Sequence, residues 1–247
     1  MKTRKFSRRT RDTAYGEAPA PAPPAVRKPV SGTVAPVVAP PVPRPVAEPR
    51  VKREIGRIDV VGLGVSTGGP NALQHIIPLI EADLKVPILA VQHMPPTFTA
   101  SLAERLDRDS NIGVEEGKEG EVVRKGTMYI APGGYHMVVR KSGTQYVLGI
   151  TSSPPVNSCR PSVDVLFRSM AMVYGGNILT VVLTGMGNDG AAGVGTIRRK
   201  GGYSIIQDEK TCVVWGMPQA VYAAGEADEV LPLEKIARRI MDIAGRG

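Results

Sequence analysis

The sequence contains few of the residues that several common classes of protein require. Its 247 residues include two cysteines, Cys159 and Cys212, so no disulfide framework is predicted and a reducing cytoplasm is the expected setting. Two thiols and three scattered histidines do not suggest a four-ligand zinc site, and we predict neither a metal nor a cofactor. No apolar run approaches the roughly 18 residues of a membrane helix, so no membrane insertion is predicted.

Positive charge is abundant only at the N-terminus. The formal net charge is +8, but residues 1–53 hold twelve Lys and Arg against three acidic residues, which leaves the rest of the chain at −1. Aromatic residues, which stack on bases in many nucleic-acid-binding domains, make up 4% of the chain. These two observations predict no nucleic-acid partner.

Proline divides the chain into two parts. Residues 1–53 contain eleven of the 22 prolines. Because proline lacks an amide hydrogen and fixes φ, this segment is predicted to be a disordered Pro/Ala-rich basic tail or linker. Residues 54–247 are then predicted to form the folded domain.

Within that domain, apolar strand-like runs alternate with amphipathic helical patterns. The clearest strand patterns are at 58–65, 86–92 and 178–185, and the helical patterns are at 70–80, 98–108, 162–175, 191–202, 217–225 and 233–245. This alternation predicts an α/β fold with a doubly wound, mostly parallel sheet and helices on both faces. Three short apolar runs within 127–152 predict a small antiparallel hairpin insertion. Glu115 and Glu116 are interpreted as part of a solvated loop.

Three polar residues follow three of the predicted strands. Ser66 follows the first strand, His93 follows the second, and Asp189 lies just beyond the run at 178–185. In an open parallel sheet, ligands bind beyond the carboxyl ends of the strands. Serine, histidine and aspartate are the nucleophile, the general base and the orienting carboxylate of a hydrolase. We therefore predict that they meet at one edge of the sheet, where amides of the turn at 66–69 stabilise an oxyanion.

Each of these residues also has an ordinary interpretation. The glycine-rich turn suggests a non-catalytic, Rossmann-like nucleotide-binding module, although G-x-G-x-x-G would need glycine where Thr67 stands. Ser66 alone is also a typical helix cap, and an aspartate between Asn and Gly is typical of turns. Ser162 and Asp164 are expected to cap the helix that they begin.

Six segments, in order, resemble the catalytic domain of the chemotaxis protein-glutamate methylesterases, the CheB family. They are "GVSTGGP", "VQHMPPTFTASLAERL", "YIAPGGYHM", "PPVNSCRPSVDVLF", "LTGMGNDGAAG" and "WGMPQAV". The resemblance runs from about residue 58 to about residue 244. It implies that Ser66, His93 and Asp189 are catalytic and that Thr67 and Met186 border the active site.

The same resemblance implies a function. Members of the family are cytoplasmic serine hydrolases that remove γ-methyl esters from glutamates of methyl-accepting chemotaxis receptors, releasing methanol, and that deamidate receptor glutamines. They usually carry an N-terminal receiver domain, and no segment here resembles one. We therefore expect either a fragment or a stand-alone esterase whose activity is not gated by phosphorylation in cis. A serine hydrolase that acts on other esters remains an alternative.

Overall fold

A computed structural model describes residues 54–245, so the tail predicted at 1–53 lies outside the described residues. Seven strands form one sheet in the order β3-β4-β2-β1-β7-β8-β9, and every neighbouring pair is parallel. The strands are β1 (Val60–Val65), β2 (Ile88–Gln92), β3 (Gly113–Glu116), β4 (Thr127–Ile130), β7 (Ile178–Val182), β8 (Tyr203–Gln207) and β9 (Glu229–Leu231). Because the order extends outward from β1 in both directions, the predicted doubly wound fold is confirmed.

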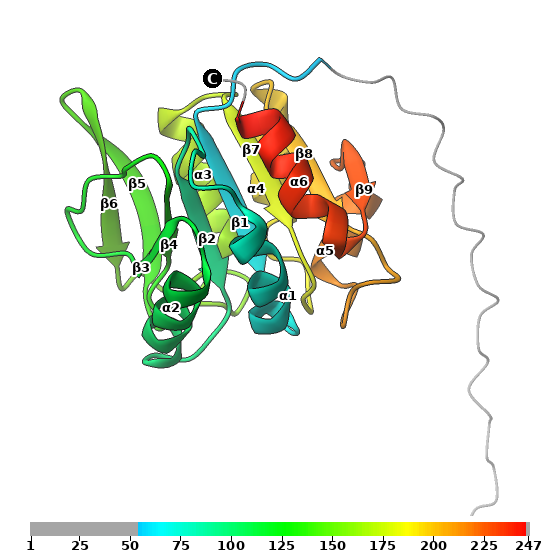
Figure 1. Cartoon of the computed structure of the whole chain (residues 1–247), viewed down its shortest axis with the longest axis horizontal. Coiled ribbons are helices and arrows are strands. Elements are labelled where there is room, and N and C mark those ends of the chain that lie inside the picture. The colour runs from blue at the N-terminus through cyan, green and yellow to red at the C-terminus, as the bar shows by residue number, and fades with distance from the viewer. Residues whose placement is uncertain (1–53, 246–247) are drawn as a thin grey trace, which may run out of the picture. The chain divides into compact units, whose positions relative to one another are not determined.

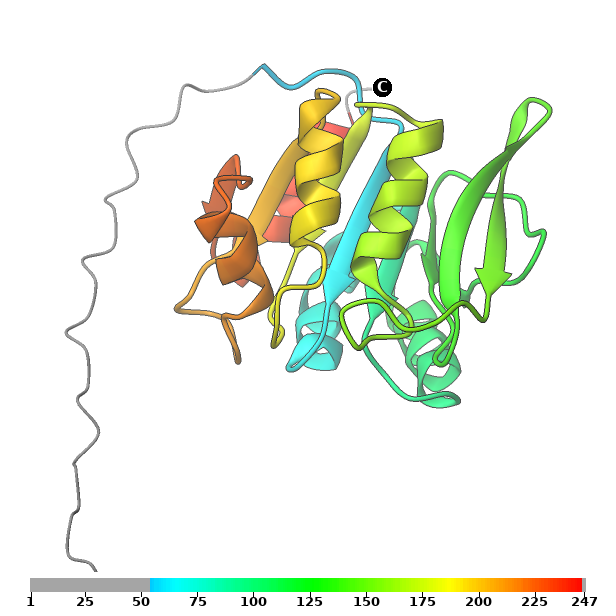
Figure 2. The same cartoon turned by 180° about the vertical axis from the view of Figure 1, so that it is seen from behind.

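Helices cover both faces of this sheet. On one face lie α1 (Gly69–Ile76), the short 3-10 helix η1 (Ile77–Leu79), α2 (Phe98–Asp109) and α6 (Leu233–Ala244) (Figure 1). On the other lie α3 (Val163–Val173), α4 (Ala191–Arg199) and α5 (Met217–Ala223) (Figure 2). Each layer of helices packs against the sheet through its own apolar cluster. The central strands are thus buried on both sides, which explains their continuous apolar sequences. None of the helices described here has the length and apolar character needed to span a bilayer.

The predicted antiparallel hairpin between α2 and α3 is confirmed, but two details of this region differ from the prediction. The hairpin consists of β5 (His136–Ser142) and β6 (Gln145–Thr151), whereas the first of the three apolar runs is β4 of the main sheet. The predicted loop at Glu115 and Glu116 is also wrong, because these residues end β3 at the edge of the sheet. Their charges are satisfied there: Arg124 contacts Glu115 at 2.7 Å, and the Thr99 hydroxyl donates to Glu116 at 2.6 Å. Charged side chains are typical of an exposed edge strand.

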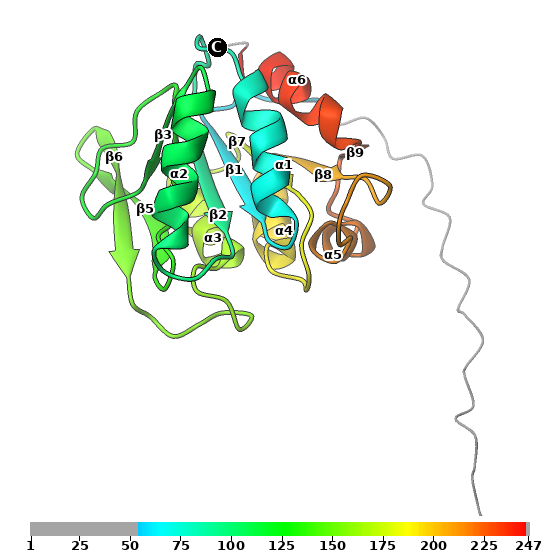
Figure 3. The ribbon, with the colours of Figure 1, turned by 60° about the horizontal axis from the view of Figure 1, so that its bottom comes forward.

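The carboxyl ends of β1, β2 and β7 bring distant segments together. Val65 pairs with Gln92 in the β1–β2 register, so Ser66 and His93 begin adjacent loops. The amide of His93 donates to the Val65 carbonyl at 3.0 Å, and the amide of Ser66 donates to the Thr184 carbonyl, also at 3.0 Å. Figure 3 turns this edge of the sheet toward the viewer. The register alone therefore places the serine turn beside the histidine.

Candidate active site

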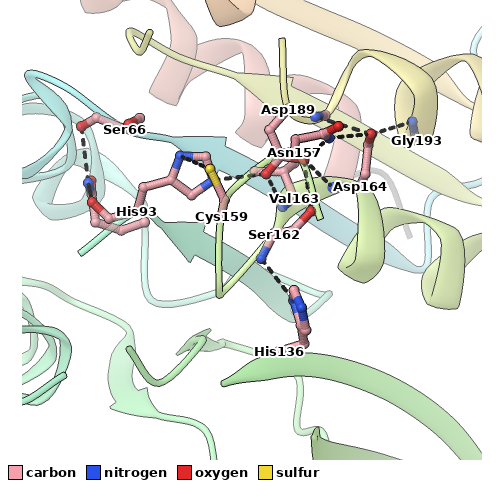
Figure 4. Close-up of polar contacts among 12 residues, drawn as sticks. Ser66, His93, His136, Asn157, Cys159, Ser162, Val163, Asp164, Asp189 and Gly193 are labelled. Carbon is pink, nitrogen blue, oxygen red and sulfur yellow. Dashed lines mark hydrogen bonds and ion pairs between the residues drawn. The ribbon is translucent and has the colours of Figure 1, made fainter. Parts of the chain in front are cut away.

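His93 and Asp189 form the central contact of the site. The Nε2 atom of His93 lies 2.8 Å from Oδ2 of Asp189, and the two side chains are 13% and 2% exposed (Figure 4). An ionised carboxylate can only accept hydrogen bonds, so the proton of the neutral imidazole is on Nε2. The lone pair is then on Nδ1, and this nitrogen is the one able to accept a proton.

The Asp189 carboxylate is held at the start of α3. It accepts from the amides of Val163 at 2.7 Å and Asp164 at 3.1 Å, and from the hydroxyl of Ser162 at 2.8 Å. The positive end of a helix dipole and its unpaired amides favour a negative charge at this place. Burial raises the pKa of Asp189, but the hydrogen bonds from His93 and these neighbours outweigh burial and lower the pKa to about 2. Asp189 is therefore ionised at neutral pH.

Asp164 makes the reciprocal contact with the next helix. Its Oδ1 accepts from the amides of Gly190 at 3.1 Å and Gly193 at 2.7 Å, at the start of α4. The expectation that Ser162 and Asp164 cap their own helix is wrong, because α3 has no side-chain cap at Ser162. Instead, Asp189 before α4 caps α3, and Asp164 of α3 caps α4. This exchange ties the two helices together at the site.

A tight turn at residues 156–159 completes the surroundings of Asp189. Val156 and Cys159 exchange backbone hydrogen bonds of 3.1 and 2.9 Å, and the two residues between them have φ of 53° and 60°. Positive φ at both central positions is typical of a type I′ turn, in which asparagine is favoured. The side-chain amide of Asn157 donates to Asp189 at 2.8 Å and to Asp164 at 2.9 Å. The sequence "VNSC" suggests a turn at most, and it carries no signal for these two partners.

The same turn places a thiol against the free nitrogen of the imidazole. The Sγ atom of Cys159 lies 3.7 Å from Nδ1 of His93. Burial, and then the charge of Asp189, raise the pKa of this thiol. Nucleophilic cysteines have a lowered pKa, whereas the pKa of this thiol is raised. The thiol is therefore the weak donor and Nδ1 the acceptor in this contact. Sequence reasoning did not include Cys159 in the site.

Ser66 lies on the turn between β1 and α1. Gln92 holds this turn, because its Nε2 donates to the carbonyls of Ser66 at 3.0 Å and His93 at 3.1 Å. Within the part of the chain that the structure describes, the Ser66 hydroxyl has no hydrogen-bond partner, and Nδ1 of His93 contacts Cys159 instead. The structure thus brings His93 and Asp189 into contact and puts Ser66 on the adjacent turn without a hydrogen bond between its hydroxyl and the ring. Catalytic hydrogen bonds often tighten only when substrate is bound.

Thr67 and Met186 lie on two loops at the same edge. Among residues 54–245, no partner is found for the amides of Thr67 and Gly68, which follow Ser66 directly. The side chain of Met186 is 73% exposed. Its neighbour Gly185 packs so closely on the serine turn that an added Cβ would lie 2.7 Å from the Cβ of Ser66. Two donors suited to an oxyanion therefore stand next to the candidate nucleophile.

Comparisons with known proteins agree on one family. The CheB methylesterase family model matches residues 61–240. Curated relatives called protein-glutamate methylesterase/protein-glutamine glutaminase, from Trichodesmium erythraeum and Desulfotalea psychrophila, are 49% and 48% identical over 185 and 202 residues. These alignments cover 75% and 77% of this chain but 53% and 56% of the relatives, so the chain spans about half the length of the curated relatives it matches.

A solved structure gives the same result over the described fold. The crystal structure of the Thermotoga maritima CheB methylesterase catalytic domain matches with a TM-score of 0.74 and 41% identity. The match covers 76% of this chain and 99% of that one. The similarity therefore extends over nearly all of that catalytic domain.

Proposed function

The chain belongs to the CheB methylesterase family, and on that premise we propose that it is a serine hydrolase of bacterial chemotaxis. Its substrates are the γ-methyl esters of glutamates on the cytoplasmic helices of methyl-accepting chemotaxis receptors, and its product is methanol. By the same chemistry it deamidates receptor glutamines. A cytoplasmic location follows from that substrate. The family does not favour the alternative of a nucleotide-binding module.

The single observation that carries this proposal is the fixed imidazole. Asp189 is ionised and holds Nε2–H of His93 at 2.8 Å, which leaves Nδ1 as the base beside the serine turn. In the proposed reaction, Nδ1 takes the proton of the Ser66 hydroxyl as its oxygen attacks the ester carbonyl. The two ring nitrogens thus exchange the roles that they have in the serine proteases, where Nε2 faces the serine.

The remaining steps use groups already in place. The amides of Thr67 and Gly68 stabilise the tetrahedral oxyanion, and His93 returns its proton to the leaving methoxide, which departs as methanol. Water then attacks the acyl-serine with the same base, releasing the glutamate. Nδ1 can accept only one hydrogen bond, so the Ser66 hydroxyl must replace the Cys159 thiol there during each cycle.

The test is methanol release from methylated receptor membranes. We expect the Ser66→Ala variant to lose several orders of magnitude of turnover, because removal of the nucleophile leaves only binding and the oxyanion donors. Equal release by wild type and Ser66→Ala would contradict the proposal. The Cys159→Ala variant is assayed beside it: loss there together with retention in Ser66→Ala would identify the thiol as the nucleophile.

A further inference from the structure

We propose that Sγ of Cys159 and Nδ1 of His93 together form a binding site for Zn²⁺, and that the bound ion inhibits the hydrolase by occupying its general base. The inhibitory half of this inference rests on the proposed function, whereas the binding half rests on the geometry alone. The sequence had suggested no metal, because the two thiols and three histidines are far apart along the chain.

The spacing of the two donor atoms fits a zinc ion. Zinc binds cysteine sulfur at about 2.3 Å and histidine nitrogen at about 2.0–2.1 Å in tetrahedral geometry, which puts two such ligands about 3.5 Å apart. The observed distance between Sγ and Nδ1 is 3.7 Å. The ion therefore requires only a small adjustment of either side chain.

Both donors are held in place before any ion arrives. The type I′ turn fixes Cys159 through two backbone hydrogen bonds to Val156, and Asp189 fixes the imidazole through Nε2. A carboxylate on the far nitrogen of a metal-binding histidine is a recurrent arrangement, since it sets the ring orientation and raises the basicity of the ligating nitrogen. Among residues 54–245, Cys159, His93 and Asp189 are the one group of three or more such side chains whose donor atoms lie within 4.8 Å of one another, and in the proposed site Cys159 and His93 bind the ion while Asp189 orients the ring.

The site can be reached from solvent. Asn157 and Ser158 of the turn are exposed, Cys159 is partly exposed, and the His93 side chain is 13% exposed. Two coordination positions remain for water, one more than in catalytic zinc sites, which have three protein ligands. Mixed thiolate and imidazole donors favour zinc over magnesium or calcium, which prefer oxygen ligands.

Binding is a proton-coupled exchange without electron transfer. The S–H bond of Cys159 breaks, its proton goes to solvent, and Zn–S and Zn–N bonds form, so one proton leaves for each ion bound. The lone pair of Nδ1 is then engaged with the ion. It cannot take the proton of Ser66, and hydrolysis stops until the ion is removed.

The binding half is tested with Co²⁺ as the spectroscopic probe, on the untagged full chain. We expect about one Co²⁺ per chain, with a thiolate-to-cobalt charge-transfer absorption that Zn²⁺ displaces. Cys159→Ala should abolish this absorption. Cys159→Ser, which nearly preserves the shape of the side chain, should abolish it too, whereas Cys212→Ala is the matched control and should keep it. No charge-transfer absorption in wild type, or an unchanged one in both Cys159 variants, would overturn the site.

The inhibitory half is tested by measuring methanol release with Zn²⁺ and then with excess chelator. The rate of each variant with Zn²⁺ is compared with the rate of the same variant in excess chelator. Wild type and Cys212→Ala should be inhibited and should recover, while Cys159→Ser and Cys159→Ala should need at least about tenfold more Zn²⁺. Binding without inhibition in an active protein would overturn this half. An inactive protein that still shows the cobalt absorption would contradict the proposed function and leave the binding site supported.

Discussion

The two sides of the His93 ring are built in contrasting ways. On the Nε2 side, a carboxylate with 2% exposure is fixed by donors from the turn at 156–159 and from the start of α3, and it shares the side-chain amide of Asn157 with a second carboxylate, Asp164. On the Nδ1 side there is one long contact to Cys159, and a serine whose hydroxyl makes no hydrogen bond with the ring. The rigid side decides which nitrogen would act as the base in the proposed reaction. The open side leaves that nitrogen available to Ser66, to a thiol or to an ion.

The largest effect is expected when the rigid side is broken at its centre. Asp189→Asn replaces one acceptor oxygen by a donor, so the carboxamide cannot accept from the Val163 amide, the Asp164 amide and Nε2–H together. The imidazole then no longer has its proton held on Nε2. We expect turnover to fall by on the order of 10⁴, the size of the effect of the equivalent substitution in a serine protease. Steady-state methanol release measures it.

The neighbour Asn188 provides the matched control. It lies on the same loop, is exposed, and its side chain makes no hydrogen bond within residues 54–245. Asn188→Ala should therefore remain within about twofold of wild type, as most surface substitutions do. If Asp189→Asn behaved like Asn188→Ala, the fixed imidazole would not be the basis of catalysis.

A smaller effect, mainly on stability, is expected at the second carboxylate. Asp164 is 3% exposed, and Asp164→Asn turns one of its oxygens into a donor that faces either the α4 amides or the Asn157 amide. An unsatisfied buried donor costs about 1–3 kcal/mol, and we expect the free energy of unfolding in urea to fall by that amount. Turnover should fall less than in Asp189→Asn, because the contact between His93 and Asp189 remains.

The control for this substitution is Arg168→Ala. The Arg168 guanidinium is half-exposed and lies 3.6 Å from the Asp164 carboxylate, so solvent screens this ion pair and we expect it to contribute at most about 1 kcal/mol. Equal losses of stability in Asp164→Asn and Arg168→Ala would show that the capping of α4 contributes little.

The same contrast explains what the sequence could predict. The serine side is local: a strand, a glycine-rich turn and a helix follow one another, and the parallel register then puts His93 beside Ser66. The rigid side is not local, since the donors to Asp189 come from 25 to 32 residues away. Local capping rules assigned Ser162 and Asp164 to their own helix, and tertiary contacts with the loop before α4 prevailed. Asn157 and Cys159 had no local signal for their partners.

The smallest effect is expected where the two sides are joined, at Asn157. Asn157→Gly removes the side-chain amide and with it one hydrogen bond to each carboxylate. Because the residue is exposed, water can replace much of this hydrogen bonding. We expect a loss of about 0.5–1.5 kcal/mol in the free energy of unfolding and less than a tenfold fall in turnover. Asn157→Ala loses the same donors and, unlike glycine, keeps a Cβ at φ of 53°, which costs about 1–2 kcal/mol relative to glycine. The glycine variant should therefore be the more stable of the two. The difference between their free energies of unfolding measures how firmly the turn holds Cys159 against Nδ1. If glycine were no better than alanine, the turn would relax in solution, and the thiol would not be held in place for the imidazole.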